Sequence, residues 1–104
     1  MSGAAPFGSE CGPWRQARIR GAAIRSLEEA YAALAAALAL PAHFGRNLDA
    51  LWDALTGDVV GPLELLWEDA AATRAALGST PFERLIAVLR EAEGVRRDFR
   101  LRLR

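Results

Sequence analysis

The sequence has no lysine, one cysteine and one histidine. A lone cysteine, Cys11, cannot form an internal disulfide or a zinc site, so we expect no metal and a reducing, cytoplasmic location. The longest alanine-rich apolar run, Ala30 to Ala42, falls short of the roughly 20 residues that a membrane span needs. The N-terminus lacks the basic start and apolar stretch of a secretion signal. These absences exclude a disulfide scaffold and a membrane partner.

The composition is that of one globular domain. Of the 104 residues, 52% are hydrophobic and 25% are charged, which is typical of a folded protein rather than a disordered one. The length excludes a multi-domain enzyme and a complete TIM barrel. Residues 1–16 are rich in Gly, Ala, Ser and Pro and show no periodicity. We interpret them as a flexible N-terminal tail before a domain over residues 17–104.

The zero net charge conceals a segregation of charge along the chain. Residues 1–26 sum to +3, residues 27–93 to −7 and residues 94–104 to +4, and every cation is an arginine. Segregated charge creates local fields even when the total is zero. The acidic middle favours a cationic partner, whereas the basic ends leave only a weak case for nucleic acid.

Hydrophobic periodicity and capping signals predict the order strand, helix, helix, strand, helix, helix, strand. The expected strands cover 17–20, 63–67 and 99–104, and the expected helices cover 27–40, 48–57, 67–77 and 81–94. Ser26 and Thr80 each begin a capping box, and Asn47 is a good N-cap for the second helix. Helical connections between strands favour a parallel sheet with right-handed crossovers.

The most distinctive segment runs from His43 to Gly57 and reads HFGRNLDALWDALTG. Asp49 and Asp53 stand one turn apart on one helical face, where their repulsion costs about 0.2–0.5 kcal/mol. The helix dipole explains an acid in the first turn, at Asp49, but not one at Asp53. Two carboxylates beside a glycine-containing loop therefore indicate a surface that receives cations.

This segment resembles the family of barstar, the intracellular inhibitor of the ribonuclease barnase. The resemblance rests on N-L-D-A-L-W-D at 47–53, on L-T-G at 55–57, and on L-A-L-P at 38–41. It continues in P-L at 62–63 and R-E-A at 90–92, and covers about Arg18 to Leu103. The resemblance implies an α/β fold: a small three-stranded parallel sheet, in the order 1-2-3, covered by about four helices.

In that family, the second helix and the loop before it plug the cationic active site of a ribonuclease. Position by position, the resemblance implies that Asp53 is the main carboxylate, with Asp49 beside it and Glu91 added from the fourth helix. The further contacts that it implies are His43, Asn47, Trp52 and Gly57. Independently of the family, carboxylates can replace phosphates against guanidinium groups and can steer association.

Three positions in the contact segment depart from the family pattern. The family's inhibitor has a tyrosine at the position of His43, an acid at Arg46 and a tryptophan at Asp58. We expect Arg46 to pair with Asp49 or with an acid of the partner. Because the core positions are kept while these change, the segment indicates the same fold directed at a different ribonuclease, or at a partner that is not a ribonuclease.

Each contact candidate also has a simpler structural interpretation. Asp49 can stabilise the helix start, Trp52 can belong to the core, and Glu91 can be ordinary helix surface. In the strand order 1-2-3, Glu64 lies between arginines 18 or 20 and 100 or 102. We expect Glu64, Glu68 and Asp98 to pair with strand arginines, which makes the basic ends a cross-strand charge pattern rather than a nucleic-acid site.

An enzyme is disfavoured because the sequence offers no nucleophile–base pair, metal cluster or phosphate loop. Asp49 and Asp53 could pass for a glycosidase pair, but both project from one helix of a small chain. The sequence therefore predicts a monomeric inhibitor of a bacterial ribonuclease, either barnase-like or divergent, without cofactor or metal. The alternatives are an interaction module with another partner and, less favoured, nucleic-acid binding through the terminal arginines.

Overall fold

The computed structural model describes residues 14–41 and 44–104. Its elements are β1 (Arg15–Arg20), the 3₁₀ turn η1 (Gly21–Ala23), α1 (Leu27–Leu38), α2 (Leu48–Asp53), the π-helical turn η2 (Ala54–Asp58), β2 (Leu63–Glu68), α3 (Ala70–Leu77), α4 (Ser79–Val95) and β3 (Phe99–Leu103). The strands form one parallel sheet in the order β1-β2-β3. The prediction of a small α/β fold, with a three-stranded parallel sheet and four helices, is confirmed.

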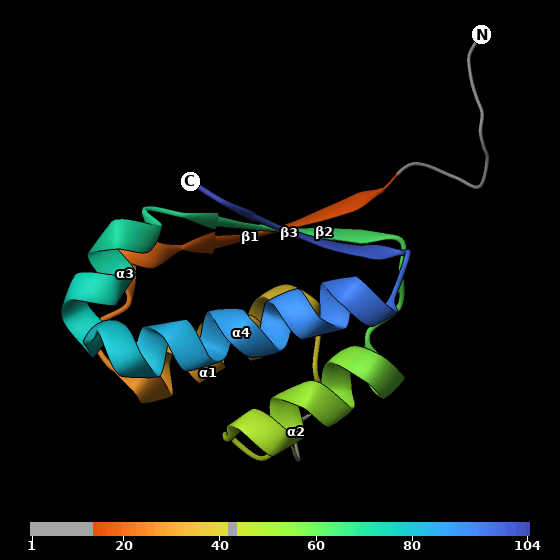
Figure 1. The fold of residues 1–104 in the computed structure, drawn as a ribbon, viewed down its shortest axis with the longest axis horizontal. Helices are drawn as coiled ribbons and strands as arrows, with labels where there is room; N and C mark the ends of the chain where they lie inside the picture. Colours follow the sequence, from red (N-terminus) through yellow and green to blue (C-terminus); the bar gives the residue numbers. More distant parts are fainter. Residues whose placement is uncertain (1–13, 42–43) are drawn as a thin grey trace, which may run out of the picture.

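The helices lie on one side of the sheet (Figure 1). α1 packs on β1, α4 packs on β3, and α2 packs on α4 rather than on the sheet. Apolar side chains alternate inward along the edge strands, as Ala17 and Ile19 in β1 and Phe99 and Leu101 in β3. The central strand also buries Trp67 completely. α2 is therefore the helix held farthest from the sheet, where its outer face is open to solvent.

Two helix starts follow the predicted capping chemistry. The Ser26 hydroxyl accepts a hydrogen bond from the Glu29 amide at 3.1 Å, and Asn47 Oδ1 accepts one from the Ala50 amide at 2.8 Å. The Glu29 carboxylate reaches back to the Arg25 amide at 2.8 Å, one residue earlier than the expected Ser26 amide. Both side chains thus satisfy helix N-terminal amides that otherwise have no partner.

The predicted cap at Thr80 is wrong. α4 begins at Ser79, and no side chain caps it. Gly78, at φ 92°, joins α3 directly to α4, so Thr80 is already inside the first helical turn. Glycine adopts this backbone conformation without steric cost, which leaves no loop in which Thr80 could act as an N-cap.

Other element boundaries also differ from the prediction, and the first helix ends at Leu38 rather than at 40. The third helix begins at Ala70 rather than at 67 or 68, because Trp67 and Glu68 complete β2 and Asp69 turns the chain with φ 53°. β1 begins at Arg15 rather than Ala17, since pairing with the start of β2 extends it. Residues 1–13 of the predicted tail lie outside the described residues.

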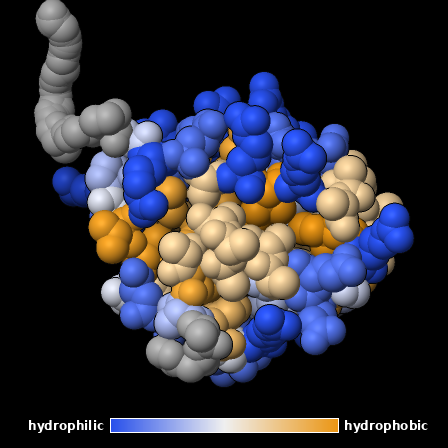
Figure 2. All heavy atoms as spheres, turned by 180° about the vertical axis from the view of Figure 1, so that it is seen from behind, coloured by the Kyte–Doolittle hydropathy of each residue, from blue (hydrophilic) through white to orange (hydrophobic). Residues whose placement is uncertain are grey.

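The back of the molecule exposes an alanine-rich face of α1 beside β1 (Figure 2). A shallow groove there is lined by small apolar side chains and bordered by Arg18, Arg20 and Glu29. None of the predicted partner contacts lines it. Across the described part of the chain, no helix combines the length and the apolar character that a membrane crossing requires.

Candidate partner-binding surface

α2 is held on the body by an apolar stripe, and this fixes which side chains face outward. Leu51 is fully buried, while Leu48 and Trp52 are half-buried and pack against the core. Asp49 and Asp53, which follow Leu48 and Trp52 in the sequence, are exposed, as the i, i+4 spacing predicts. Trp52 therefore serves packing and also leaves part of its side chain at the surface.

The exposed acids of this region have no partners within the described chain. Asp49 and Asp53 on α2, Asp58 at the end of η2 and Glu91 on α4 are all exposed. None of the four takes part in any ion pair within residues 14–41 and 44–104. We call these four residues the acidic surface. Within residues 14–41 and 44–104, these carboxylates therefore face solvent without a paired arginine.

η2 continues the helix past Asp53 and ends the contact segment. Val59 N–H donates to the Ala54 carbonyl at 3.0 Å, and the Thr56 hydroxyl donates to the Trp52 carbonyl at 2.8 Å. Gly57 is exposed in this turn, and a Cβ added there would meet no described atom within 4 Å. The packing of the free chain therefore does not require glycine at 57, and the position leaves room for another backbone or side chain to approach.

The loop before α2 is described from Phe44 onward, and His43 lies outside the described residues. The Phe44 ring packs at a tilt of 57° against Tyr31 of α1, with ring centroids 6.3 Å apart. Arg46 pairs with Glu28 of α1, with a closest N–O distance of 3.7 Å, and not with Asp49 as one expectation had it. Both partners are more than half exposed, so the pair contributes little stability. It nevertheless directs the Arg46 charge toward α1 and leaves Asp49 unneutralised.

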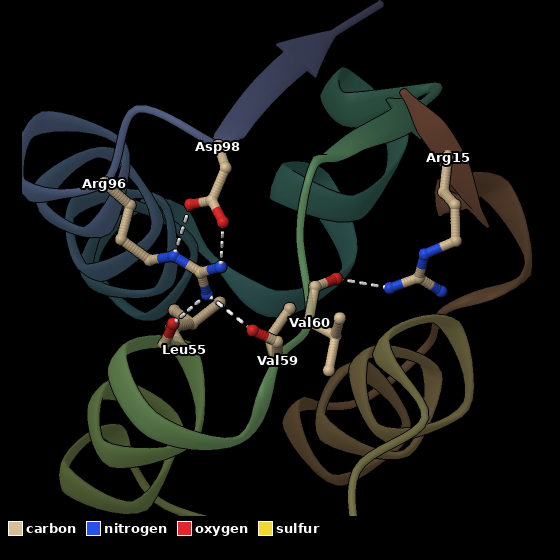
Figure 3. A network of polar contacts seen from close by, with 6 residues as sticks. All are labelled: Arg15, Leu55, Val59, Val60, Arg96 and Asp98. Atoms are coloured by element: carbon tan, nitrogen blue, oxygen red, sulfur yellow. Dashed lines mark hydrogen bonds and ion pairs between the residues drawn. The ribbon is translucent and has the colours of Figure 1, made fainter. Parts of the chain in front are cut away.

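The Arg96 guanidinium binds the end of the contact segment, an arrangement that the sequence did not predict (Figure 3). Arg96 Nη1 donates to the carbonyls of Leu55 and Val59, at 2.6 and 2.8 Å. Its Nε and Nη2 bind the two carboxylate oxygens of Asp98, each at 2.9 Å. The hydrogen bond from Arg96 lowers the pKa of Asp98 below its ordinary value. Asp98 thus pairs with a loop arginine, which corrects the expected pairing with a strand arginine.

The other face of the sheet carries a cross-strand charge pattern, which corrects the prediction on one side: the β1 neighbour of Glu64 is Gln16 rather than Arg18 or Arg20. Glu64 lies in register between Gln16 and Arg100. Its carboxylate accepts a hydrogen bond from Gln16 at 2.9 Å and pairs with Arg102 and Arg100 at 3.6 and 3.9 Å. The Gln16 hydrogen bond, followed by the charges of Arg102 and Arg100, lowers the pKa of Glu64.

Glu68, at the far end of the same strand, pairs with Arg18 at 3.7 Å. The acids of the central strand are therefore matched by arginines of both edge strands. Among the described residues, no group of three or more His, Cys, Asp or Glu side chains could hold a metal ion. The acidic surface on α2, η2 and α4 differs from the sheet, since its four carboxylates form no ion pair within the described part of the chain.

Comparison with known proteins places these features in a family. The family model described as Barstar (barnase inhibitor) matches residues 14–104. The chain is also 33% identical over 87 residues to a protein of Bacillus subtilis (strain 168) named "Putative ribonuclease inhibitor YrdF". That alignment covers 84% of this chain and 96% of the relative. With its parallel sheet and outward acidic helix, the chain belongs to the barstar family.

Proposed function

We propose that this chain is a cytoplasmic inhibitor of a bacterial ribonuclease and has no catalytic activity of its own. The observation that supports this most directly is the acidic surface: Asp49, Asp53, Asp58 and Glu91 are exposed and lack ion-pair partners among the described residues. A ribonuclease active site holds RNA phosphates with cationic side chains, and carboxylates compete for the same guanidinium hydrogen bonds.

In this proposal Asp53 is the central carboxylate. It lies at the last position of α2, with Asp49 one turn before it and the exposed Gly57 one turn after it. Trp52 supplies a partly exposed apolar edge beside the carboxylates, a residue type enriched where interfaces gain most of their affinity. Asn47 fixes the start of α2 through its cap and so sets the direction in which Asp49 points.

The target differs from barnase in this proposal. Asp58 adds a carboxylate where the family's inhibitor has a tryptophan, and Arg46 places a cation beside the contact face. An inhibitor of this kind fits a cleft whose rim offers a further cation opposite Asp58 and an acid opposite Arg46. The relative's printed name, a ribonuclease inhibitor, supports the enzyme class and leaves the individual enzyme to experiment.

The test uses the chain as bait against a lysate of the source cell and as an inhibitor of purified bacterial ribonucleases, barnase included. Asp53→Ala is the loss variant. Glu83→Ala is the matched control, because it removes an exposed acid that already pairs with Arg74 of α3. We expect wild type and Glu83→Ala to capture a ribonuclease and to inhibit it stoichiometrically, and Asp53→Ala to lose about a hundredfold or more in affinity.

Three results would overturn the proposal. Capture of a partner without ribonuclease activity would favour an interaction module. Binding of RNA that Asp53→Ala leaves unchanged, with no enzyme captured, would favour the nucleic-acid alternative. Hydrolysis of RNA, sugars or phosphoesters that follows the pure chain and disappears in Asp53→Ala would make the protein an enzyme.

A further inference from the structure

We propose that Arg96 is a positioning residue. It fixes residues Leu55–Val59, at the end of the contact segment, in their binding conformation. This inference rests on the proposed function for its effect on affinity, but its structural half can be tested without any partner. It assigns a role to a residue that comes after α4 and is not among the predicted contacts.

The first observation is that Arg96 uses all three of its nitrogens. Nη1 donates to two carbonyls of the contact segment, those of Leu55 and Val59, while Nε and Nη2 hold Asp98. The carbonyls at a helix C-terminus lack intrahelical partners, and a cation near them is favoured by the helix dipole. Arg96 therefore satisfies groups that no helical hydrogen bond reaches.

The second observation is that Arg96 is itself held in place. Its side chain is only 16% exposed. The backbone carbonyl of Asp98 accepts a hydrogen bond from the Leu63 amide at 2.8 Å, which ties Asp98 to the first residue of β2. A Cβ at Gly61 would lie 2.4 Å from Asp98 Oδ2, so the absence of a side chain at 61 makes space for this carboxylate. The rigid sheet thus supports Asp98, and Asp98 orients Arg96.

The third observation is what lies between the two carbonyls. Thr56, Gly57 and Asp58 form the exposed arc between Leu55 and Val59. Fixing both ends of this arc fixes where Gly57 and Asp58 stand relative to Asp53. Pre-organised binding segments lose less conformational entropy on association, which increases affinity without any new contact.

The decisive comparison is Arg96→Met against Arg90→Met. Arg90 lies within α4, donates to the Leu101 carbonyl at 3.0 Å and pairs with Glu93 at 3.1 Å, and makes no bond to the contact segment. Each variant loses a guanidinium that donates to a backbone carbonyl elsewhere in the fold. Only Arg96→Met releases residues 55–59. Arg96→Lys keeps the charge but not the planar fork that serves four acceptors at once.

Amide hydrogen exchange of the free proteins tests the structural half. We expect the Val59 amide to exchange at least about tenfold faster in Arg96→Met than in Arg90→Met, after both are normalised to their global unfolding, with Arg96→Lys in between. Equal normalised protection of Val59 in the two methionine variants would overturn the inference, whatever the chain binds.

Dissociation from a ribonuclease that wild type inhibits tests the functional half. We expect Arg96→Met to dissociate about tenfold faster at a temperature where it is fully folded, Arg90→Met to stay within about twofold of wild type, and Arg96→Lys to recover part of the loss. Faster Val59 exchange with an unchanged dissociation rate would overturn the role in binding. If no ribonuclease binds wild type at all, the proposed function fails, and the exchange result still decides whether Arg96 fixes the segment.

Discussion

The open face of the sheet and the acidic surface both present rows of charged side chains, yet they differ in how those charges are satisfied. On the sheet, Glu64 contacts Gln16 of β1 and pairs with Arg100 and Arg102 of β3, and Glu68 pairs with Arg18 of β1. On α2, Asp49 and Asp53 are exposed and form no ion pair with any arginine that the structure describes. Charges that are matched within a chain act on its stability, whereas unmatched ones repel each other until a partner neutralises them. The comparison separates charge that maintains the fold from charge that is available for binding.

The strongest way to break this comparison is Asp53→Asn, which keeps the shape of the side chain and removes its charge. We expect affinity for the captured ribonuclease to fall by about a hundredfold or more, because removing one member of a buried charge pair costs about 3–5 kcal/mol. Stability should stay the same or rise by about 0.2–0.5 kcal/mol, since the repulsion from Asp49 is relieved. Calorimetric titration and urea unfolding measure the two effects. A variant that loses stability and keeps its affinity would place Asp53 in the fold rather than in the interface.

The comparison is sharpened by exchanging the positions that depart from the family pattern. The triple variant His43→Tyr, Arg46→Glu, Asp58→Trp removes a cation and supplies aromatic contacts, so it should inhibit barnase at least about tenfold better than wild type. The gain should come chiefly from faster association at low salt, because Arg46 no longer repels a cationic cleft. Inhibition titrations at low and moderate ionic strength measure it. Equal inhibition by wild type would show that these positions do not set partner choice.

Helix caps provide a smaller contrast within the fold itself. Ser26→Ala should lower the free energy of unfolding by about 0.5–2 kcal/mol, because the hydroxyl caps α1. Thr80→Ala should change it by less than about 0.5 kcal/mol, because α4 has no side-chain cap. Neither variant should alter affinity for the ribonuclease. Thermal unfolding of both, run side by side, checks the ranking. A loss of affinity at unchanged stability would show that the binding surface extends to these sites.

The smallest expected effect is a change in pH dependence from Glu64→Gln. The pKa of Glu64 is lowered in the folded chain, so its carboxylate stabilises the fold above the unfolded pKa. That contribution is lost as the pH falls through the lower folded value. The free energy of unfolding of the variant should therefore fall less steeply than that of wild type as the pH drops below about 4.5. The difference in slope corresponds to the uptake of at most one proton. Inhibition should be unchanged. Identical acid limbs in the two proteins would show that the sheet charges contribute nothing to stability.

Local patterns predicted the fold well because they depend on neighbours in sequence. Asn47, with a helical apolar stripe after it, specified α2 and its outward acids. The strand order predicted the arginines of β3 beside Glu64, but not Gln16 on the β1 side, because the order of strands does not fix their register. The prediction of a cap at Thr80 was wrong although the sequence pattern is that of a capping box. The direct junction of the two helices at Gly78 places Thr80 inside α4.

Arg96 could not be found from sequence because its acceptors are distant. The carbonyls of Leu55 and Val59 lie 41 and 37 residues earlier in the chain, and a backbone carbonyl leaves no mark in a sequence. The short separation of Arg96 and Asp98, two residues, was the only available signal. It indicates a local ion pair, but not that the pair reaches across to the contact segment.

The all-parallel sheet affects when, during synthesis of the chain, residues 55–59 can reach their final conformation. Gln16 meets Glu64 across 48 residues of chain, and α2 lies within that crossover, while Asp98 and Arg96 come just before the last strand. Contacts between segments so far apart in the chain close slowly, since the entropy of the intervening loop is lost before any contact forms. A nascent chain that ends before Arg96 contains the residues of the acidic surface. It lacks the Arg96–Asp98 pair that we propose to fix residues 55–59. Under the proposed function, β3 must therefore leave the ribosome and pair before residues 55–59 reach the conformation that binds the enzyme.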